Sequence, residues 1–176
     1  MNAYPIRKIS VADLEVLQEI SRDTFLETFA DSNTETNMAL YLEQSLSLEK
    51  LRTELLDPHS AFYFLEDGDL VIGFLKINES AAQTEPNEVQ SMEIERIYVR
   101  KAHHGKKLGQ LLFEKALALA QEKNCAYLWL GVWEKNLRAI RFYEKNGLVQ
   151  FGQHVFQLGD DAQTDILMKL VLNKTD

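Results

Sequence analysis

Long apolar runs are absent from this sequence, and so is a charged leader followed by an apolar stretch. A membrane helix needs roughly 18 apolar residues or more, so we expect no membrane span, no membrane partner and a cytoplasmic location. Cys125 is the only cysteine among 176 residues, which excludes an internal disulfide. Because its neighbours form the apolar segment 125–132, the thiol is predicted to be buried in a strand and not to act as a nucleophile.

Positive charge is also scarce. The net charge is −8 at pH 7 with a pI near 5.1, and the basic residues are not segregated apart from one cluster in segment 100–107. Such a chain repels phosphates, so we expect no nucleic-acid partner. The four histidines show no metal-ligand spacing with cysteine or carboxylates, so no metal site is expected. They are His59, His103, His104 and His154.

The chain length suits one compact domain over residues 1–176, with 45% hydrophobic and 26% charged residues to build its core and surface. Apolar periodicity and turn residues predict alternating elements along it. Helices are expected at 11–29, 34–46, 48–56, 105–124 and 136–146. Strands are expected at 4–9, 61–66, 70–78, 91–99, 126–132, 148–158 and 164–172. Segment 80–90 is predicted to be a mobile loop.

Strand 91–99, helix 105–124 and strand 126–132 form a β-α-β unit, whose strands should be parallel with a right-handed crossover. The Asp-Gly pair at 67–68 predicts a hairpin, and the remaining strands also follow one another closely. The sequence therefore predicts an α/β fold. Its mixed, mostly antiparallel sheet of about seven strands should hold the parallel unit at its centre, flanked by helices.

One segment joins a strand to a helix through a short basic turn, and it reads EIERIYVRKAHHGKKLGQLL over residues 93–112. Such a junction directs backbone N–H groups and the positive end of a helix dipole at one point, where a phosphate can bind. A solvated basic loop is the alternative. The turn has neither the P-loop order nor the G-x-G-x-x-G order, and the chain contains no G-x-S-x-G elbow.

A second segment, NLRAIRFYEKNGL at 136–148, strengthens this reading. Together the two resemble the GNAT family of acetyl-CoA-dependent N-acetyltransferases, with motifs Q/R-x-x-G-x-G/A and roughly N-x-x-A-x-x-F-Y-x-x-x-G-F. In the first motif His104 and Lys107 depart from the pattern, whereas Gly109 matches its last position. The matches to the second motif are Asn136, Ala139, Phe142, Tyr143 and Gly147.

The resemblance implies a single GNAT-like domain that uses acetyl-CoA as co-substrate and no metal. It also implies that strands 91–99 and 126–132 splay apart around the pantetheine arm. Asn136 would bind that arm, cap its helix, or do both. Arg138 and Lys145 would reach the phosphates, with solvated charge as the alternative. The expected cofactor-binding residues are Ile97, Tyr98, Val99, His104, Gly105, Lys106, Lys107, Leu108, Gly109, Gln110, Asn136, Ala139, Tyr143 and Lys145.

The expected catalytic residues are Tyr143, Glu93 and Glu95. Tyr143 takes the place of the family's tyrosine that protonates the departing thiolate, and a core aromatic is the alternative. In a regular strand Glu93 and Glu95 would share one face with Ile97 and Val99, whereas a bulge would change the faces. Either carboxylate could bind a cationic amine and take its proton. Glu93 is the first choice by family position, and exposed charge or a pair with Arg96 is the alternative.

The acceptor is indicated by a further resemblance. Segments 25–46, 129–136 and 159–168 are similar to a polyamine-acetylating branch of the family, the PaiA-type spermidine/spermine N-acetyltransferases. This implies direct attack by a primary amine of spermidine or spermine. The acidic residues that would attract it are Glu27, Asp31, Glu35 and Glu43, with a solvated acidic helix face as the alternative. A non-catalytic acetyl-CoA-binding module, a protein amine or another small amine as acceptor, and a homodimer all stay open.

Overall fold

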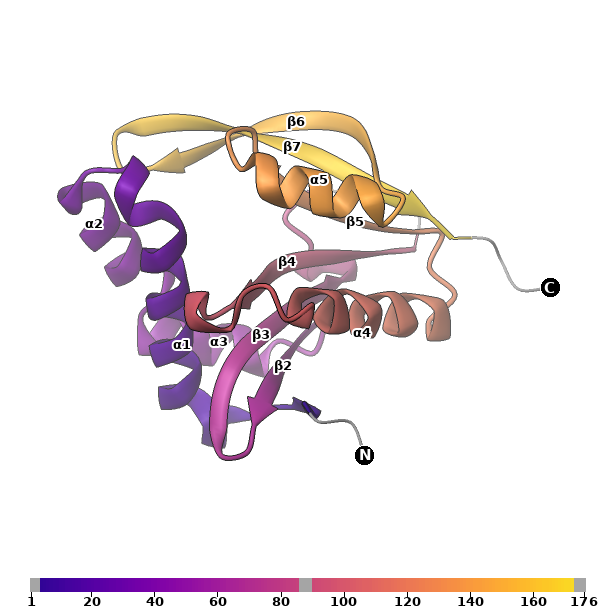
Figure 1. Cartoon of the computed structure of the whole chain (residues 1–176), viewed down its shortest axis with the longest axis horizontal. Coiled ribbons are helices and arrows are strands. Elements are labelled where there is room, and N and C mark those ends of the chain that lie inside the picture. Colours follow the sequence, from indigo (N-terminus) through magenta and orange to yellow (C-terminus); the bar gives the residue numbers. More distant parts are fainter. Residues whose placement is uncertain (1–3, 86–89, 173–176) are drawn as a thin grey trace.

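The structure is a computed structural model that describes residues 4–85 and 90–172 (Figure 1). Its strands are β1 (Ile6–Lys8), β2 (Ser60–Asp67), β3 (Leu70–Glu79), β4 (Ser91–Val99), β5 (Tyr127–Trp133), β6 (Val149–Leu158) and β7 (Asp161–Val171). Its α-helices are α1 (Leu14–Phe29), α2 (Glu35–Ser45), α3 (Leu48–Leu56), α4 (Leu108–Glu122) and α5 (Leu137–Lys145). Short 3-10 turns are η1 (Val11–Asp13), η2 (Ala30–Ser32), η3 (Ser80–Ala82) and η4 (Lys101–His103).

The strands form one seven-stranded sheet in the order β1-β2-β3-β4-β5-β7-β6. Every neighbouring pair is antiparallel except β4 and β5, which are parallel and are joined through α4. The predicted α/β fold with a central β-α-β unit is confirmed. None of the helices within 4–85 and 90–172 is long and apolar enough to cross a membrane.

Local sequence explains most element boundaries. Ser10 caps η1 in a capping box, and Thr34 and Ser47 cap α2 and α3 through their hydroxyl groups. Gly68, at φ +60°, makes the tight turn between β2 and β3. The helix expected from residue 105 begins only at Leu108, because two preceding residues lie in the left-handed region. In segment 80–90, η3 is described and residues 86–89 lie outside the described residues, so its mobility stays a prediction.

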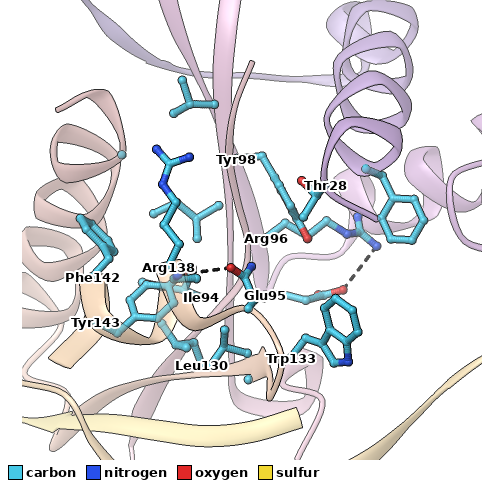
Figure 2. Close-up of a pocket in the computed structure, with 18 of the residues that line it drawn as sticks. Thr28, Ile94, Glu95, Arg96, Tyr98, Leu130, Trp133, Arg138, Phe142 and Tyr143 are labelled. Atoms are coloured by element: carbon cyan, nitrogen blue, oxygen red, sulfur yellow. Dashed lines mark hydrogen bonds and ion pairs between the residues drawn. The ribbon is translucent and has the colours of Figure 1, made fainter. Parts of the chain in front are cut away.

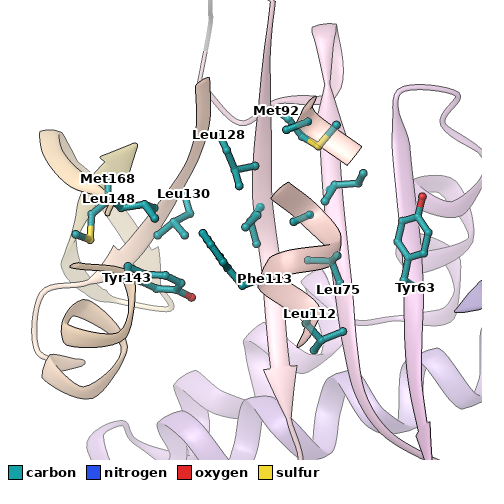
Figure 3. Close-up of a cluster of buried hydrophobic side chains, with 14 of the residues drawn as sticks. Tyr63, Leu75, Met92, Leu112, Phe113, Leu128, Leu130, Tyr143, Leu148 and Met168 are labelled. Atoms are coloured by element: carbon teal, nitrogen blue, oxygen red, sulfur yellow. The ribbon is translucent and has the colours of Figure 1, made fainter. Parts of the chain in front are cut away.

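Two apolar clusters cover the two faces of the sheet. The first joins α4 and α5 to the sheet and contains Leu112, Phe113, Leu128 and Leu130 (Figure 3). Cys125 is buried in this cluster, as predicted, although it precedes β5 and does not lie in the strand, and burial raises the pKa of its thiol. The second cluster packs the first three helices against the other face.

β4 and β5 pair over only three positions, from Ser91 with Tyr127 to Glu93 with Trp129. Beyond Glu93 the two strands diverge, with α4 drawn along β4 and α5 along β5 in Figure 1. The expected splay is therefore confirmed. The backbone of residues 94–99 pairs with β3 on one side and leaves its other edge facing the opening.

Candidate active site

A cavity of about 1090 Å³ opens where β4 and β5 separate. Its lining comes from α1, α2, the strands β4 to β7, α5 and the turn before α4. In Figure 2, Arg138, Phe142 and Tyr143 lie on one side of this opening. Arg96 and Trp133 lie on the other side, and Glu95 lies between. All the predicted catalytic and cofactor-binding residues except the exposed Lys106 line the cavity.

A β-bulge in β4 decides which side chains face which part of the cavity. Ile77 pairs with Ile94 and Lys76 pairs with Arg96, so Glu95 is the extra residue. Ile97 and Val99 consequently pack on the face of α4, whereas Glu93 shares the opposite face with Asn78. Of the two predicted alternatives, the bulge is the observed one, and it shifts the alternation by one residue so that Glu93 does not share a face with Ile97 and Val99.

Glu93 is a buried carboxylate that accepts hydrogen bonds and has no ion pair with the lysines and arginines of residues 4–85 and 90–172. The Thr84 backbone N–H donates to its Oε2 at 2.8 Å and the Thr84 hydroxyl to its Oε1 at 2.5 Å. The Asn78 amide donates to Oε2 at 3.1 Å. Burial raises the pKa of Glu93 above its usual range, and the hydrogen bonds from Thr84 and Asn78 only partly oppose this. The raised pKa makes Glu93 a stronger proton acceptor than an ordinary carboxylate.

Glu95 has a different environment, because it belongs to an ion cluster with Lys76, Arg96 and Glu54. Lys76 contacts both carboxylates, and Arg96 donates to Glu54 at 2.7 Å and lies 3.4 Å from Glu95. Burial alone would raise the pKa of Glu95, but Arg96 and Lys76 lower it below its usual range. Glu95 therefore stays ionised and compensated, so the predicted alternative of a pair with Arg96 is the observed arrangement.

Glu54→Gln should lower the free energy of unfolding by about 3 kcal/mol. The change leaves Lys76 and Arg96 buried with a single carboxylate between them, and an uncompensated buried charge is costly. Urea denaturation of Glu54→Gln against the exposed α3 control Glu49→Gln measures the difference. Equal stability of the two variants would mean that solvent already screens the cluster.

Tyr143 lines the cavity from α5 and is buried at its base. Burial raises the pKa of its hydroxyl, which stays protonated across the physiological range. Ile94 of β4 and Leu130 of β5 line the same opening (Figure 2). Tyr143 thus lies beside the gap between the two strands with a protonated hydroxyl group, and its predicted role as the acid stays a prediction.

The turn before α4 presents free backbone donors. Gly105 and Lys107 have φ of +83° and +59°, and no side chain caps the helix. Within the described part of the chain, no hydrogen bond takes up the N–H groups of residues 107–109. A Cβ on Gly109 would meet nothing within 4 Å. Free amides next to a helix dipole and basic side chains are groups that an anion favours, so the predicted phosphate turn stays a prediction that this geometry suits.

His104, which replaces the family's Gln or Arg, connects this turn to the end of β4 and to α5. Its Nε2 lies 2.7 Å from the Val99 carbonyl, and its Nδ1 lies 3.0 Å from the Arg138 guanidinium. Because a carbonyl only accepts and a guanidinium only donates, the imidazole is the neutral tautomer with its proton on Nε2. His104 thereby holds Arg138 beside the turn.

Three other predicted cofactor-binding residues line the cavity, and two of them also have hydrogen-bond partners in the protein. Asn136 caps α5, since its side chain accepts from the Ala139 N–H at 3.2 Å. Gln110 and Asn146 exchange two hydrogen bonds that tie α4 to α5. Lys145 lines the cavity from the last turn of α5. Of these, Asn136 combines the cap with a place in the cavity wall, so both of its predicted roles remain compatible.

Gly109→Leu should weaken acetyl-CoA binding about tenfold or more, because the new side chain would occupy the open space before the free amides and cost at least one charge-assisted hydrogen bond. Calorimetry with acetyl-CoA measures the affinity. Ala118→Leu, an exposed change on the same helix, is the matched control. Equal affinities in two folded variants would remove the phosphate site from this turn.

The other half of the cavity is aromatic and acidic. Phe29 lies 5.9 Å from Trp133 between ring centroids, and Tyr41 lies 5.9 Å from Phe156. Glu27 lines the cavity, whereas Asp31, Glu35 and Glu43 are exposed and outside its lining. Sequence reasoning missed several lining residues of this half, because no motif marks them. They are Phe29, Tyr41, Trp133, His154, Phe156, Gln163 and Asp165.

Comparisons with known proteins agree with this geometry. Residues 14–148 match the acetyltransferase (GNAT) family. The chain is 44% identical to an uncharacterized N-acetyltransferase in the pepI 3' region of Lactobacillus delbrueckii subsp. lactis, over 98% of this chain and 99% of that protein. It is 27% identical to the spermidine N(1)-acetyltransferase of Thermoplasma acidophilum, over 93% of this chain and 94% of that protein. PaiA N-acetyltransferase from T. acidophilum, crystallised with coenzyme A, superposes with a TM-score of 0.79 at 25% identity, over 96% and 99% of the two chains.

Proposed function

This chain belongs to the GNAT family and is an acetyl-CoA-dependent N-acetyltransferase, and we propose that it acetylates a primary amine of a polyamine such as spermidine or spermine. The amine attacks the thioester directly. A non-catalytic binding module is set aside, because relatives matched over nearly their whole length are named as N-acetyltransferases.

The residues around the splayed strands fit acetyl-CoA. The free amides of residues 107–109 suit the pyrophosphate, with Arg138 and Lys145 nearby to neutralise charge. The unpaired edge of β4 at 97–99 suits the amides of the pantetheine arm. When bound, acetyl-CoA supplies the thioester whose acetyl group is transferred. Two of these groups also contact His104, because Arg138 lies 3.0 Å from its Nδ1 and the Val99 carbonyl lies 2.7 Å from its Nε2.

Glu93 serves as the base in this proposal. An alkylammonium must lose a proton before its nitrogen can attack, and a carboxylate with a raised pKa accepts that proton more readily than an ordinary one. Burial provides the raised pKa at Glu93. Glu95 is a poorer base, because Lys76 and Arg96 already lower its pKa.

Tyr143 serves as the acid. The C–N bond forms as the C–S bond breaks, and the departing thiolate takes the hydroxyl proton of Tyr143. The high pKa that burial gives this hydroxyl keeps the proton available for that step. Its place on α5, beside the gap between β4 and β5, supports the assignment.

One observation supports a polyamine acceptor above all others: the likeness to a spermidine N(1)-acetyltransferase extends over 93% of this chain. The chemistry of the cavity agrees, because aromatic rings and carboxylates together attract alkylammonium groups. A peptide acceptor would gain less from such a wall.

A panel of amines tests the proposal. We expect kcat/KM for spermidine and spermine to exceed the values for a monoamine, an aminoglycoside and a peptide with a free N-terminus. Release of the coenzyme A thiol provides the readout. Brisk turnover of the other amines without turnover of either polyamine would refute the polyamine acceptor and leave the N-acetyltransferase activity intact.

A further inference from the structure

Asp165 is a carboxylate in the cavity wall that neither of the family motifs includes. It lies on β7, opposite Trp133 of β5 and His154 of β6. Its Oδ2 is 3.5 Å from the Nε2 of His154, whose Nδ1 is 2.8 Å from the Oε1 of Glu85. With both carboxylates ionised, the three side chains carry a net negative charge whether or not His154 is protonated.

The negative charge of Asp165 is open to a ligand. Among the described residues, no lysine or arginine lies within ion-pair distance of it, in contrast to Glu95. Burial raises the pKa of Asp165, and His154 only partly opposes this. A partly desolvated carboxylate whose fixed partner is a histidine, and not a lysine or arginine, gains from a mobile cation.

Space for that cation is provided by Gly131. A Cβ at this position would lie 3.5 Å from Asp165 Oδ2 and 3.6 Å from His154 Cε1. Gly131 is exposed in the cavity wall, so no side chain at this position covers the carboxylate. The glycine thus leaves the oxygen accessible from the cavity.

The surrounding wall suits an alkyl chain. Trp133, directly opposite Asp165, belongs to a run of aromatic rings that continues through Phe29 and Phe25 to Tyr41. Ring faces bind methylene groups through apolar contact and attract ammonium groups through their quadrupole. The wall therefore favours a chain that carries positive charges separated by methylene groups.

We propose that Asp165 binds the second, non-reacting ammonium group of a diamine or polyamine acceptor, while Glu93 serves the reacting amine. This rests on the proposed function. Strand β5 lies between the two carboxylates, because Glu93 pairs with Trp129 and Asp165 pairs with Trp133. Trp129 and Trp133 are four residues apart, and at about 3.3 Å per residue this gives roughly 13 Å along the strand. The acceptor that reaches both must have its two amines well separated, as spermidine does.

Asp165→Asn tests the site. It should raise KM for spermidine about tenfold or more, the usual worth of a hydrogen bond to a charged group, and leave KM for a monoamine unchanged. Asp67→Asn, the same change at an exposed turn, should alter neither KM, which controls for the loss of long-range attraction. Unchanged acetyl-CoA affinity by calorimetry shows that each variant is folded.

The wild-type protein gives a second test that needs no variant. 1,8-Diaminooctane should have a KM about tenfold or more below that of octylamine, because only the diamine reaches both carboxylates. 1,2-Diaminoethane should gain nothing over ethylamine. If polyamines are substrates but Asp165→Asn behaves like Asp67→Asn, the second site is refuted alone. If no diamine or polyamine is acetylated, the proposed function fails.

Discussion

Tyr143→Phe should lower kcat about 100-fold or more while the affinity for acetyl-CoA stays nearly unchanged. The substitution removes only the hydroxyl group, so the ring still fills the buried position between α5 and the sheet. Without that donor the thiolate must leave unprotonated or take a proton from water, and the loss of a general acid usually costs this much. Steady-state kinetics and calorimetry together separate the two quantities.

Tyr63→Phe is the matched control for this experiment. Tyr63 is a buried tyrosine of the same apolar cluster, but it lies on β2, far across the sheet from Tyr143 (Figure 3). The Tyr63→Phe variant should retain wild-type kcat. A fully active Tyr143→Phe variant would contradict the assignment and make water the proton donor.

Glu93→Gln should lower kcat/KM at neutral pH about 100-fold or more and change the pH profile. Gln keeps the size of the side chain but cannot accept the proton of the amine. In the wild type, Glu93 is active when ionised, so activity should rise as pH passes upward through its pKa, which burial raises. In the variant that rise should disappear, leaving only the rise from deprotonation of the free amine.

Glu122→Gln, an exposed change on α4, provides the control for the net charge and should keep the wild-type profile. A Glu93→Gln variant with an unaltered pH profile and unaltered kcat/KM would exclude Glu93 as the base. The hydrogen bonds from Thr84 and Asn78 to Glu93 would then have only a structural role.

Most elements of the fold followed from local patterns. Strand β4 and helix α3 have the predicted bounds, because Asp57-Pro58 ends α3 and polar segments flank β4. The bulge at Glu95 had no local signal, since it depends on how β4 pairs with β3. That one residue moved Ile97 and Val99 to the opposite face from Glu93.

The candidate site also contains residues that local sequence locates and residues that only the fold brings together. The turn at 104–110 and the residues around Tyr143 are contiguous in sequence, so a motif could locate them. Asp165, His154 and Trp133 come together only through the pairing of β5, β6 and β7, and Phe29 reaches Trp133 from α1. Such contacts between distant segments define the acceptor side, where local patterns carry little information.

Acetylation of spermidine by the purified protein, with the coenzyme A thiol and the product mass measured in one reaction, tests the central claim most directly. We predict one thiol released for each spermidine that gains a single acetyl group, and neither product in the absence of acetyl-CoA. Thiol release without a mass increase on spermidine, or no release at all, would contradict the claim that this chain is a polyamine N-acetyltransferase.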